Sequence, residues 1–133
     1  MVDVTEAQIW TEFKGEVVDV ALEQPKEEDR LPQYHIQIKP LDKEIKGPTG
    51  LMHEWIRKTA TTTDTSIPRG SVVHRYYEAL EDVHGDDVKN LKTISEVFEF
   101  MKGKKYLFKS KVLGRAFQNQ PASEYWVPVK LLD

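Results

Sequence analysis

Apolar and polar residues alternate along several stretches of this 133-residue chain, and each alternation predicts a β-strand. The clearest alternation gives one face of Tyr34, Ile36 and Ile38 and an opposite face of His35, Gln37 and Lys39. Four further strands are predicted over residues 13–22, 52–60, 104–114 and 125–131. Gly15 is expected to mark a bulge or kink in the first strand, and Pro128 places the last at a sheet edge or a non-bonding position.

Two segments between the third and fourth strands have helical spacing instead. In residues 71–82, Ser71 is expected to cap the helix, and the apolar positions are Val72, Val73, Tyr76, Tyr77 and Leu80. The second segment begins with a capping box of Thr93 and Glu96, ends at Gly103, and has the apolar positions Ile94, Val97, Phe98 and Met101. The threonine-rich residues 59–66 are expected to form an exposed loop, which either closes over a bound strand or has no role.

Length and composition restrict the class of protein. The chain is expected to form a single domain over residues 1–133, with an acidic extension at 1–12 and the sheet between 13 and 131. Because cysteine is absent, disulfide scaffolds, zinc ribbons and thiol nucleophiles are excluded. No apolar run approaches the ~20 residues that span a bilayer, so we expect a soluble, cytoplasmic protein with no membrane partner.

The order of these elements resembles a known fold. Three strands, two helices and a final hairpin are similar to archaeal and phage single-strand-binding domains of the oligonucleotide/oligosaccharide-binding (OB) type. The residues that carry the resemblance are the helix entering the fourth strand (98–106) and the closing segment 125–129. It implies a mainly β fold, a five-stranded Greek-key barrel with two helices between strands three and four, the second helix plugging the barrel's open end. The rival architecture is an open sheet with both helices on one face. Either fold is expected to bury Phe13, Tyr34, Phe98, Tyr106 and Phe108.

Charge is distributed in blocks along the chain. The formal net charge is -3, yet residues 34–77 carry seven basic and four acidic side chains, and residues 102–133 carry seven and two. Because salt screens charges over about 8 Å, a ligand responds to the local surface more than to the total. The two basic blocks are therefore candidates for a polyanion-binding face.

No catalytic or metal-binding constellation is present in the sequence. The segment His53-Glu54-Trp55-Ile56-Arg57 begins like the zinc motif H-E-x-x-H, but Arg57 replaces the second histidine and the segment reads as a strand. The four histidines lie in separate predicted elements, and the glycines match no phosphate-binding loop. We expect no enzyme activity, no cofactor and no metal.

The residues instead suit a non-catalytic surface for single-stranded nucleic acid. Such a surface needs cations along a groove and aromatic rings on which bases stack. Trp55 and Trp126 each neighbour a residue suited to the core, Ile56 or Val127, so alternation predicts that both rings face outward. The candidate binding residues are Trp55, Arg57, Lys58, Lys109, Lys111, Arg115, Phe117, Trp126 and Lys130. The expected partner is single-stranded DNA or RNA, with DNA preferred, and nothing in the sequence signals a contact to a 2′-hydroxyl.

Two other classes fit the same sequence. The acidic segments 1–33 and 78–101, or an exposed sheet edge, could dock a protein partner. A small ligand or sugar could occupy the same barrel face. Convergence of the cations in one groove favours nucleic acid, whereas their dispersal favours a protein-interaction module.

Overall fold

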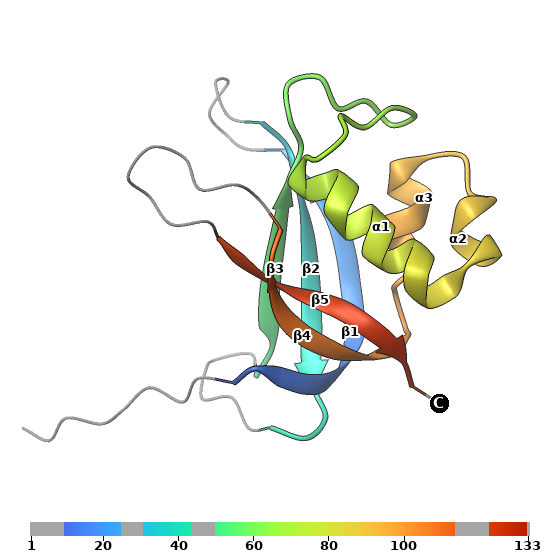
Figure 1. The fold of residues 1–133 in the computed structure, drawn as a ribbon. Coiled ribbons are helices and arrows are strands. Elements are labelled where there is room, and N and C mark those ends of the chain that lie inside the picture. The colour runs from blue at the N-terminus through green and yellow to red at the C-terminus, as the bar shows by residue number, and fades with distance from the viewer. Residues whose placement is uncertain (1–9, 25–30, 44–49, 114–122, 133) are drawn as a thin grey trace, which may run out of the picture.

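The computed structural model describes residues 10–24, 31–43, 50–113 and 123–132 (Figure 1). Along the chain the elements are β1 (Glu12–Glu23), β2 (Gln33–Pro40), β3 (Met52–Arg57), α1 (Val72–His84), α2 (Asp86–Lys89), α3 (Ile94–Glu99), β4 (Lys105–Val112) and β5 (Glu124–Leu131). All five predicted strands and both predicted helices are confirmed. The four-residue helix α2 was not predicted, because one turn is too short to show a period.

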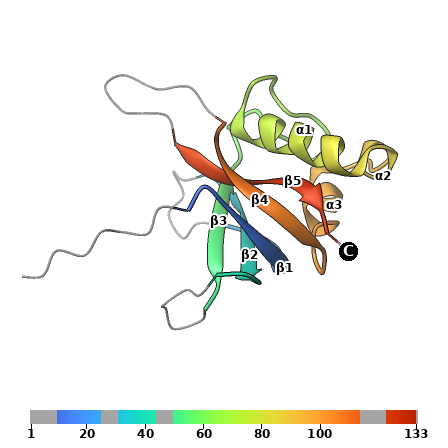
Figure 2. The ribbon, with the colours of Figure 1, turned by 60° about the horizontal axis from the view of Figure 1, so that its bottom comes forward.

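The strands form one antiparallel sheet in the order β3-β2-β1-β4-β5. Figures 1 and 2 show β4 and β5 lying across β1, β2 and β3, with the helices grouped at one side. The mainly β prediction is confirmed. The closed Greek-key barrel is not, because in the described part of the chain no ladder of backbone hydrogen bonds joins the outer strands β3 and β5.

Of the predicted bulge or kink at Gly15, the bulge lies elsewhere in β1. The register of β1 against β2 shifts between Val17 and Asp19, whereas Gly15 is paired regularly with β2 and β4. A Cβ atom on Gly15 would lie 2.6 Å from Ile38 Cγ2 and 2.8 Å from the Phe13 ring. Glycine is therefore needed here because side chains pack closely over the backbone.

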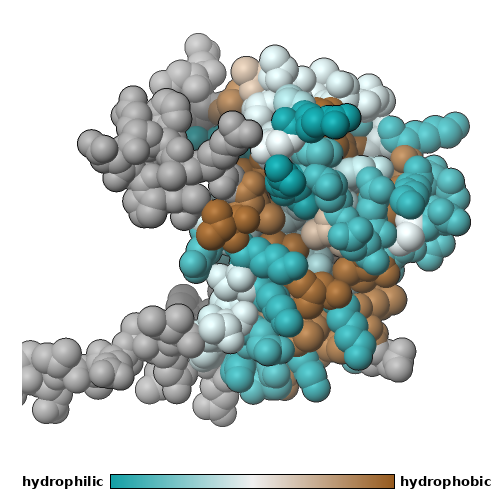
Figure 3. Space-filling model, viewed as in Figure 1, coloured by the Kyte–Doolittle hydropathy of each residue, from teal (hydrophilic) through white to brown (hydrophobic). Residues whose placement is uncertain are grey.

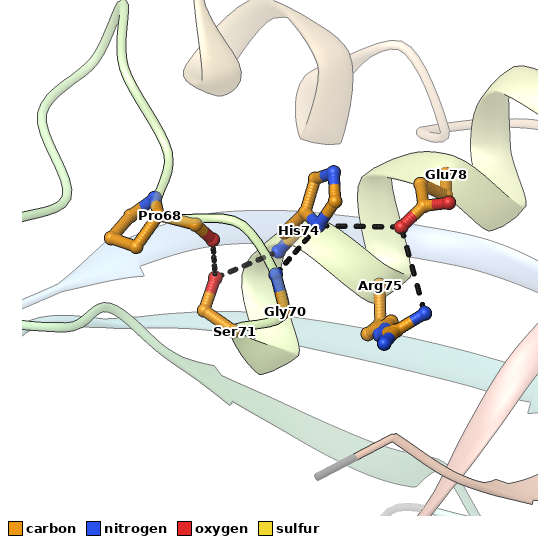
Figure 4. A network of polar contacts seen from close by, with 6 residues as sticks. All are labelled: Pro68, Gly70, Ser71, His74, Arg75 and Glu78. Carbon is orange, nitrogen blue, oxygen red and sulfur yellow. Dashed lines mark hydrogen bonds and ion pairs between the residues drawn. The ribbon is translucent and has the colours of Figure 1, made fainter.

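The N-terminus of α1 begins as the sequence predicts, at a capping serine (Figure 4). The Ser71 hydroxyl donates to the Pro68 carbonyl at 2.8 Å and accepts the His74 backbone N–H at 3.1 Å. The Gly70 N–H donates to His74 Nδ1 at 2.9 Å, so this nitrogen carries no proton. The contact of His74 Nδ1 with Glu78 at 3.3 Å is therefore not an ion pair while that hydrogen bond is made.

The capping box of α3 is confirmed as well. Thr93 Oγ1 accepts the Glu96 N–H at 3.2 Å and donates to the Glu96 carboxylate at 3.0 Å. After the helix, Gly103 adopts a φ of 84° and its N–H donates to the Val17 carbonyl at 2.7 Å. The positive φ turns the chain from α3 into β4 beside the bulge of β1.

The core lies between the sheet and the helices and contains every aromatic residue that was predicted to be buried. Phe98 of α3 stacks on Tyr34 at 4.2 Å between ring centroids and lies 5.7 Å from Tyr76 of α1. Phe13 and Phe108 stack at 5.3 Å across β1 and β4. These rings connect both helices to both parts of the sheet, so the outer face of β2 and β3 rests on a packed interior.

Candidate nucleic-acid interface

Trp55 lies on the outer face of β3, as alternation predicts. Its neighbours Glu54 and Ile56 are buried, whereas 41% of the surface of Trp55 is exposed. The indole ring stacks on His35 of β2, with 3.8 Å between centroids and 5° between planes. One face of the indole is thus covered by the imidazole, and the two rings lie parallel to each other.

His35 is itself held by two polar contacts. Its Nδ1 atom lies 2.9 Å from Glu23 Oε1 of β1, and its Nε2 atom lies 2.7 Å from His53 Nδ1 of β3. The two imidazole rings are near parallel, 5.0 Å apart. His35 is buried although it lies on the polar face of its strand, because these side chains and Trp55 surround it. We call Glu23, His35 and His53 the histidine chain.

A cavity of about 580 Å³ adjoins Trp55 where β3 ends. It brings together Arg57 and Lys58 from β3 and the residue after it, and Ser123 and Tyr125 from the start of β5. The remaining lining residues are Leu31, Gln33, Thr59, Ala60, Ser71 and Val72. We call this space the tryptophan cavity. Three predicted site residues therefore meet at one place, with an aromatic face beside two cations.

A buried carboxylate joins the outer strands next to this cavity. Glu54 Oε2 accepts the backbone N–H of Trp126 at 2.9 Å, and Glu54 Oε1 accepts the Trp55 N–H at 3.3 Å. Burial raises the pKa of the Glu54 carboxyl, and the two backbone N–H bonds lower it by less. Burial also raises the pKa of Tyr125, which Glu54 raises further and Arg57 lowers. The Tyr125 hydroxyl is thus a neutral hydrogen-bonding group near the cavity's arginine.

The prediction that Trp126 faces outward is wrong. Trp126 is half-buried and contacts the buried Phe13 edge-on, with ring centroids 4.9 Å apart. Its backbone carbonyl accepts a hydrogen bond from the Tyr76 hydroxyl at 2.9 Å. Val127 is buried as well, because α1 packs against β5. Both faces of β5 are covered at this point, so alternation does not identify an exposed side.

Among the described residues, the predicted lysines 109, 111 and 130 do not line the tryptophan cavity with Arg57 and Lys58. Lys111 lines a second cavity of about 580 Å³ beside α1, together with Arg69, Arg75, Glu78 and Asp82 among others. Lys109 and Lys130 are exposed and line neither cavity. The predicted residues Arg115 and Phe117 lie outside the described residues. The single trough expected from the sequence is therefore replaced by separate basic positions.

The threonine-rich segment after β3 is folded onto the helices. Thr59 bonds to Thr62 through its N–H at 3.2 Å and through its hydroxyl at 2.6 Å. Asp64 Oδ1 accepts hydrogen bonds from both the N–H and the hydroxyl of Ser95 in α3. The segment thus supplies a fixed wall of the tryptophan cavity at Thr59, with its far end anchored on α3.

Sequence reasoning missed the histidine chain and Tyr125. It treated histidines 35 and 53 as residues of separate strands, and only the register of β2 against β3 brings their rings together. The one available signal was that His35 and Trp55 both lie on polar faces of neighbouring strands. Tyr125 gave no signal, because its role depends on where β5 meets β3.

Comparisons with protein-family models, with curated proteins and with solved structures found no match to this chain. Within the described ranges, no helix has the length and apolar content needed to cross a bilayer. Those same ranges contain no group of three or more acidic or histidine side chains arranged to hold a metal ion.

Proposed function

We propose that this protein binds single-stranded nucleic acid, with DNA preferred, and does no catalysis. The observation that carries the proposal is the exposed Trp55 ring, held flat on His35 beside a cavity containing Arg57 and Lys58. A base would stack on the open face of the indole, and the two cations would contact the adjoining phosphates. Neither contact reads sequence, so binding would tolerate any base.

The stacking of Trp55 on His35 supports a role of Trp55 in base stacking. An aromatic side chain that must be ordered on binding costs affinity, whereas Trp55 is already stacked on one side. The tryptophan cavity, at about 580 Å³, also lies within the roughly 300–1,000 Å³ range of small-molecule sites. It is therefore large enough for a nucleotide of a bound strand.

We further propose that the sheet is an OB-type barrel whose last seam is closed by side chains. Strand β1 pairs with both β2 and β4, which leaves β3 and β5 as the strands that closure would bring together. Glu54 of β3 accepts the Trp126 N–H across that seam, and Tyr76 of α1 donates to the Trp126 carbonyl from the helix. Ligands of OB barrels bind on the face of strands two and three and at the loop between strands four and five. Trp55, on the outer face of β3, lies on the corresponding face.

The test is fluorescence anisotropy of a labelled dT oligomer, with a double-stranded DNA control and a salt series from 50 mM. Trp55→Ala should weaken binding by about 1–3 kcal/mol, roughly 5- to 150-fold, with little loss of thermal stability. The double substitution Arg57→Ala with Lys58→Ala should weaken binding and lower the salt slope by about 0.7 per lost phosphate contact. Lys89→Ala on α2 is the matched control: an exposed lysine away from the cavity, whose loss should change neither quantity.

Absence of dT binding by the wild-type protein at 50 mM salt would reject the proposal. The alternative is a protein-interaction module, for which Figure 3 offers a surface: hydrophobic side chains emerge among hydrophilic ones over β4 and β5. The large hydrophobic residues exposed on these strands are Val112 and Leu131. Equal affinity for dT and duplex DNA would instead indicate charge-driven binding without base stacking.

A further inference from the structure

The base-stacking ring of the proposed site rests on a residue that can change its charge. His35 covers one face of Trp55 at 3.8 Å, and its own ring is fixed by Glu23 on one side and His53 on the other. These three side chains come from three adjacent strands, β1, β2 and β3. The orientation of the indole therefore depends on hydrogen bonds that involve two titratable imidazoles.

The distances fix where the protons are. The ionised Glu23 carboxylate accepts a hydrogen bond from His35 Nδ1–H, so a neutral His35 has an unprotonated Nε2 atom. That atom must then accept from His53 Nδ1–H at 2.7 Å, which leaves His53 Nε2 without a proton. One further proton can be added to His53 Nε2, or to His35 Nε2 with a change of tautomer at His53, and both hydrogen bonds remain. A second added proton would place the N–H groups of His35 and His53 against each other and break the hydrogen bond between the two rings.

We propose that His35 positions Trp55 for base stacking and that the histidine chain takes up one proton as the pH falls, which strengthens binding of single-stranded nucleic acid. This rests on the proposed function. The added charge would lie on His35 or His53, beside the Trp55 ring and on a surface that must attract phosphates. Stacking survives this step, because the first proton leaves His35 bonded to both partners.

Charged groups of both signs share the face of the histidine chain. By register, β1 contributes the carboxylates of Glu16, Asp19 and Glu23, β2 contributes Lys39, and β3 contributes Arg57. Glu23 is the group in direct contact, with Oε1 2.9 Å from His35 Nδ1. Asp19 also faces Lys102, at 3.5 Å.

A shared metal ion does not account for the geometry of the two rings. Nitrogen ligands of a tetrahedral zinc ion lie about 2.0–2.1 Å from the metal, which separates two such nitrogens by roughly 3.3 Å. The nitrogens of His35 and His53 are 2.7 Å apart, a hydrogen-bond distance.

The experiment measures dT-oligomer affinity at about pH 8 and about pH 5.5 in 50 mM salt, on either side of the usual histidine range. One extra phosphate contact should make the wild-type protein bind about five- to tenfold more tightly at the lower pH. The double substitution His35→Phe with His53→Gln keeps a ring against Trp55 and removes both imidazoles, so it should retain the affinity at pH 8 and lose the gain. His35→Ala with His53→Gln should lose both. His74→Gln, on α1 away from this face, should keep the full gain.

A second measurement needs no variant. In a nuclear magnetic resonance titration of the wild-type protein, the ring signals of His35 and His53 and the indole N–H of Trp55 should change at the same pH. Because linkage is reciprocal, a tenfold gain in affinity requires bound dT to raise that midpoint by about one pH unit.

The outcomes separate this proposal from the proposed function. If the wild-type protein binds no dT at either pH, the proposed function fails. If it binds but the variant His35→Phe with His53→Gln shows the same gain, or if dT leaves the midpoint unchanged, the role of the histidine chain is refuted while nucleic-acid binding stands.

Discussion

Replacing Glu54 tests how the two outer strands of the sheet are held together. Glu54 is buried, and its carboxylate accepts the Trp126 N–H at 2.9 Å across a seam that carries no backbone ladder between the described parts of β3 and β5. In Glu54→Ala the Trp126 N–H loses its acceptor, whereas in Glu54→Gln the amide oxygen can still accept it. Neither variant carries the buried charge, so the difference between them excludes the charge and contains the hydrogen bond together with the lost packing of the side chain.

The expected magnitude follows from the unsatisfied donor. A buried N–H left without a partner costs about 1–3 kcal/mol, so Glu54→Ala should be less stable than Glu54→Gln by about 2 kcal/mol. In thermal unfolding this corresponds to a melting temperature roughly 5–10 °C lower. Equal stability of the two variants would show that the Trp126 N–H does not need this acceptor.

The pH dependence gives a second check with a definite sign. Burial raises the pKa of Glu54 in the folded state, so the group favours folding below its unfolded pKa, and that contribution is lost as the pH rises through the folded pKa. Glu54→Gln cannot ionise. Its stability advantage over the wild-type protein should therefore be largest at neutral pH and shrink as the pH falls towards the ordinary range of glutamate. Urea denaturation followed by tryptophan fluorescence measures this, and an advantage that grows in acid would refute the reasoning.

Three other substitutions test the packing and the helix cap, each read by urea denaturation. Trp126→Ala should lower the free energy of unfolding by about 2–4 kcal/mol, because the ring packs on Phe13. A loss below about 0.5 kcal/mol would indicate that the ring lies on the surface. Gly15→Ala should lower the free energy of unfolding by about 1–3 kcal/mol, because the new Cβ would lie 2.6 Å from Ile38. An unchanged stability would show that the neighbouring side chains move aside at little cost. Ser71→Ala should cost about 1 kcal/mol by removing the N-cap of α1, and Ser71→Thr, which keeps a hydroxyl that donates to Pro68 and accepts from His74, should largely avoid that cost.

Local features of the fold could be predicted because local rules determine them. Side-chain alternation located Trp55 outside and Ile56 inside, since a strand in contact with the core on one face leaves the other free. Ser71 and Thr93 marked helix starts because a capping hydroxyl acts within three residues of its own position.

Features that depend on distant segments could not be predicted. The side on which Trp126 lies depends on α1 covering β5, about fifty residues earlier in the chain. The contact between His35 and His53 depends on the register of β2 against β3, which the alternation of each strand does not specify. Arg57 of β3 and Lys111 of β4 line different cavities, and the distance between them depends on the twist and curvature of the whole sheet.

The seam and the proposed site share residues, and this ties the stability of the fold to binding. Glu54 points inward to β5 while its neighbour Trp55 points outward, and Tyr125 of β5 lines the same cavity as Trp55. Loss of the Glu54 contact should therefore let the two walls of the tryptophan cavity move relative to each other. Glu54→Ala should weaken dT binding even at temperatures where the variant is fully folded, whereas Trp126→Ala, destabilising by another route, should keep the Glu54 contact to its backbone N–H. Equal losses of affinity in these two variants, in proportion to their losses of stability, would mean that binding follows overall folding and not the geometry of the seam.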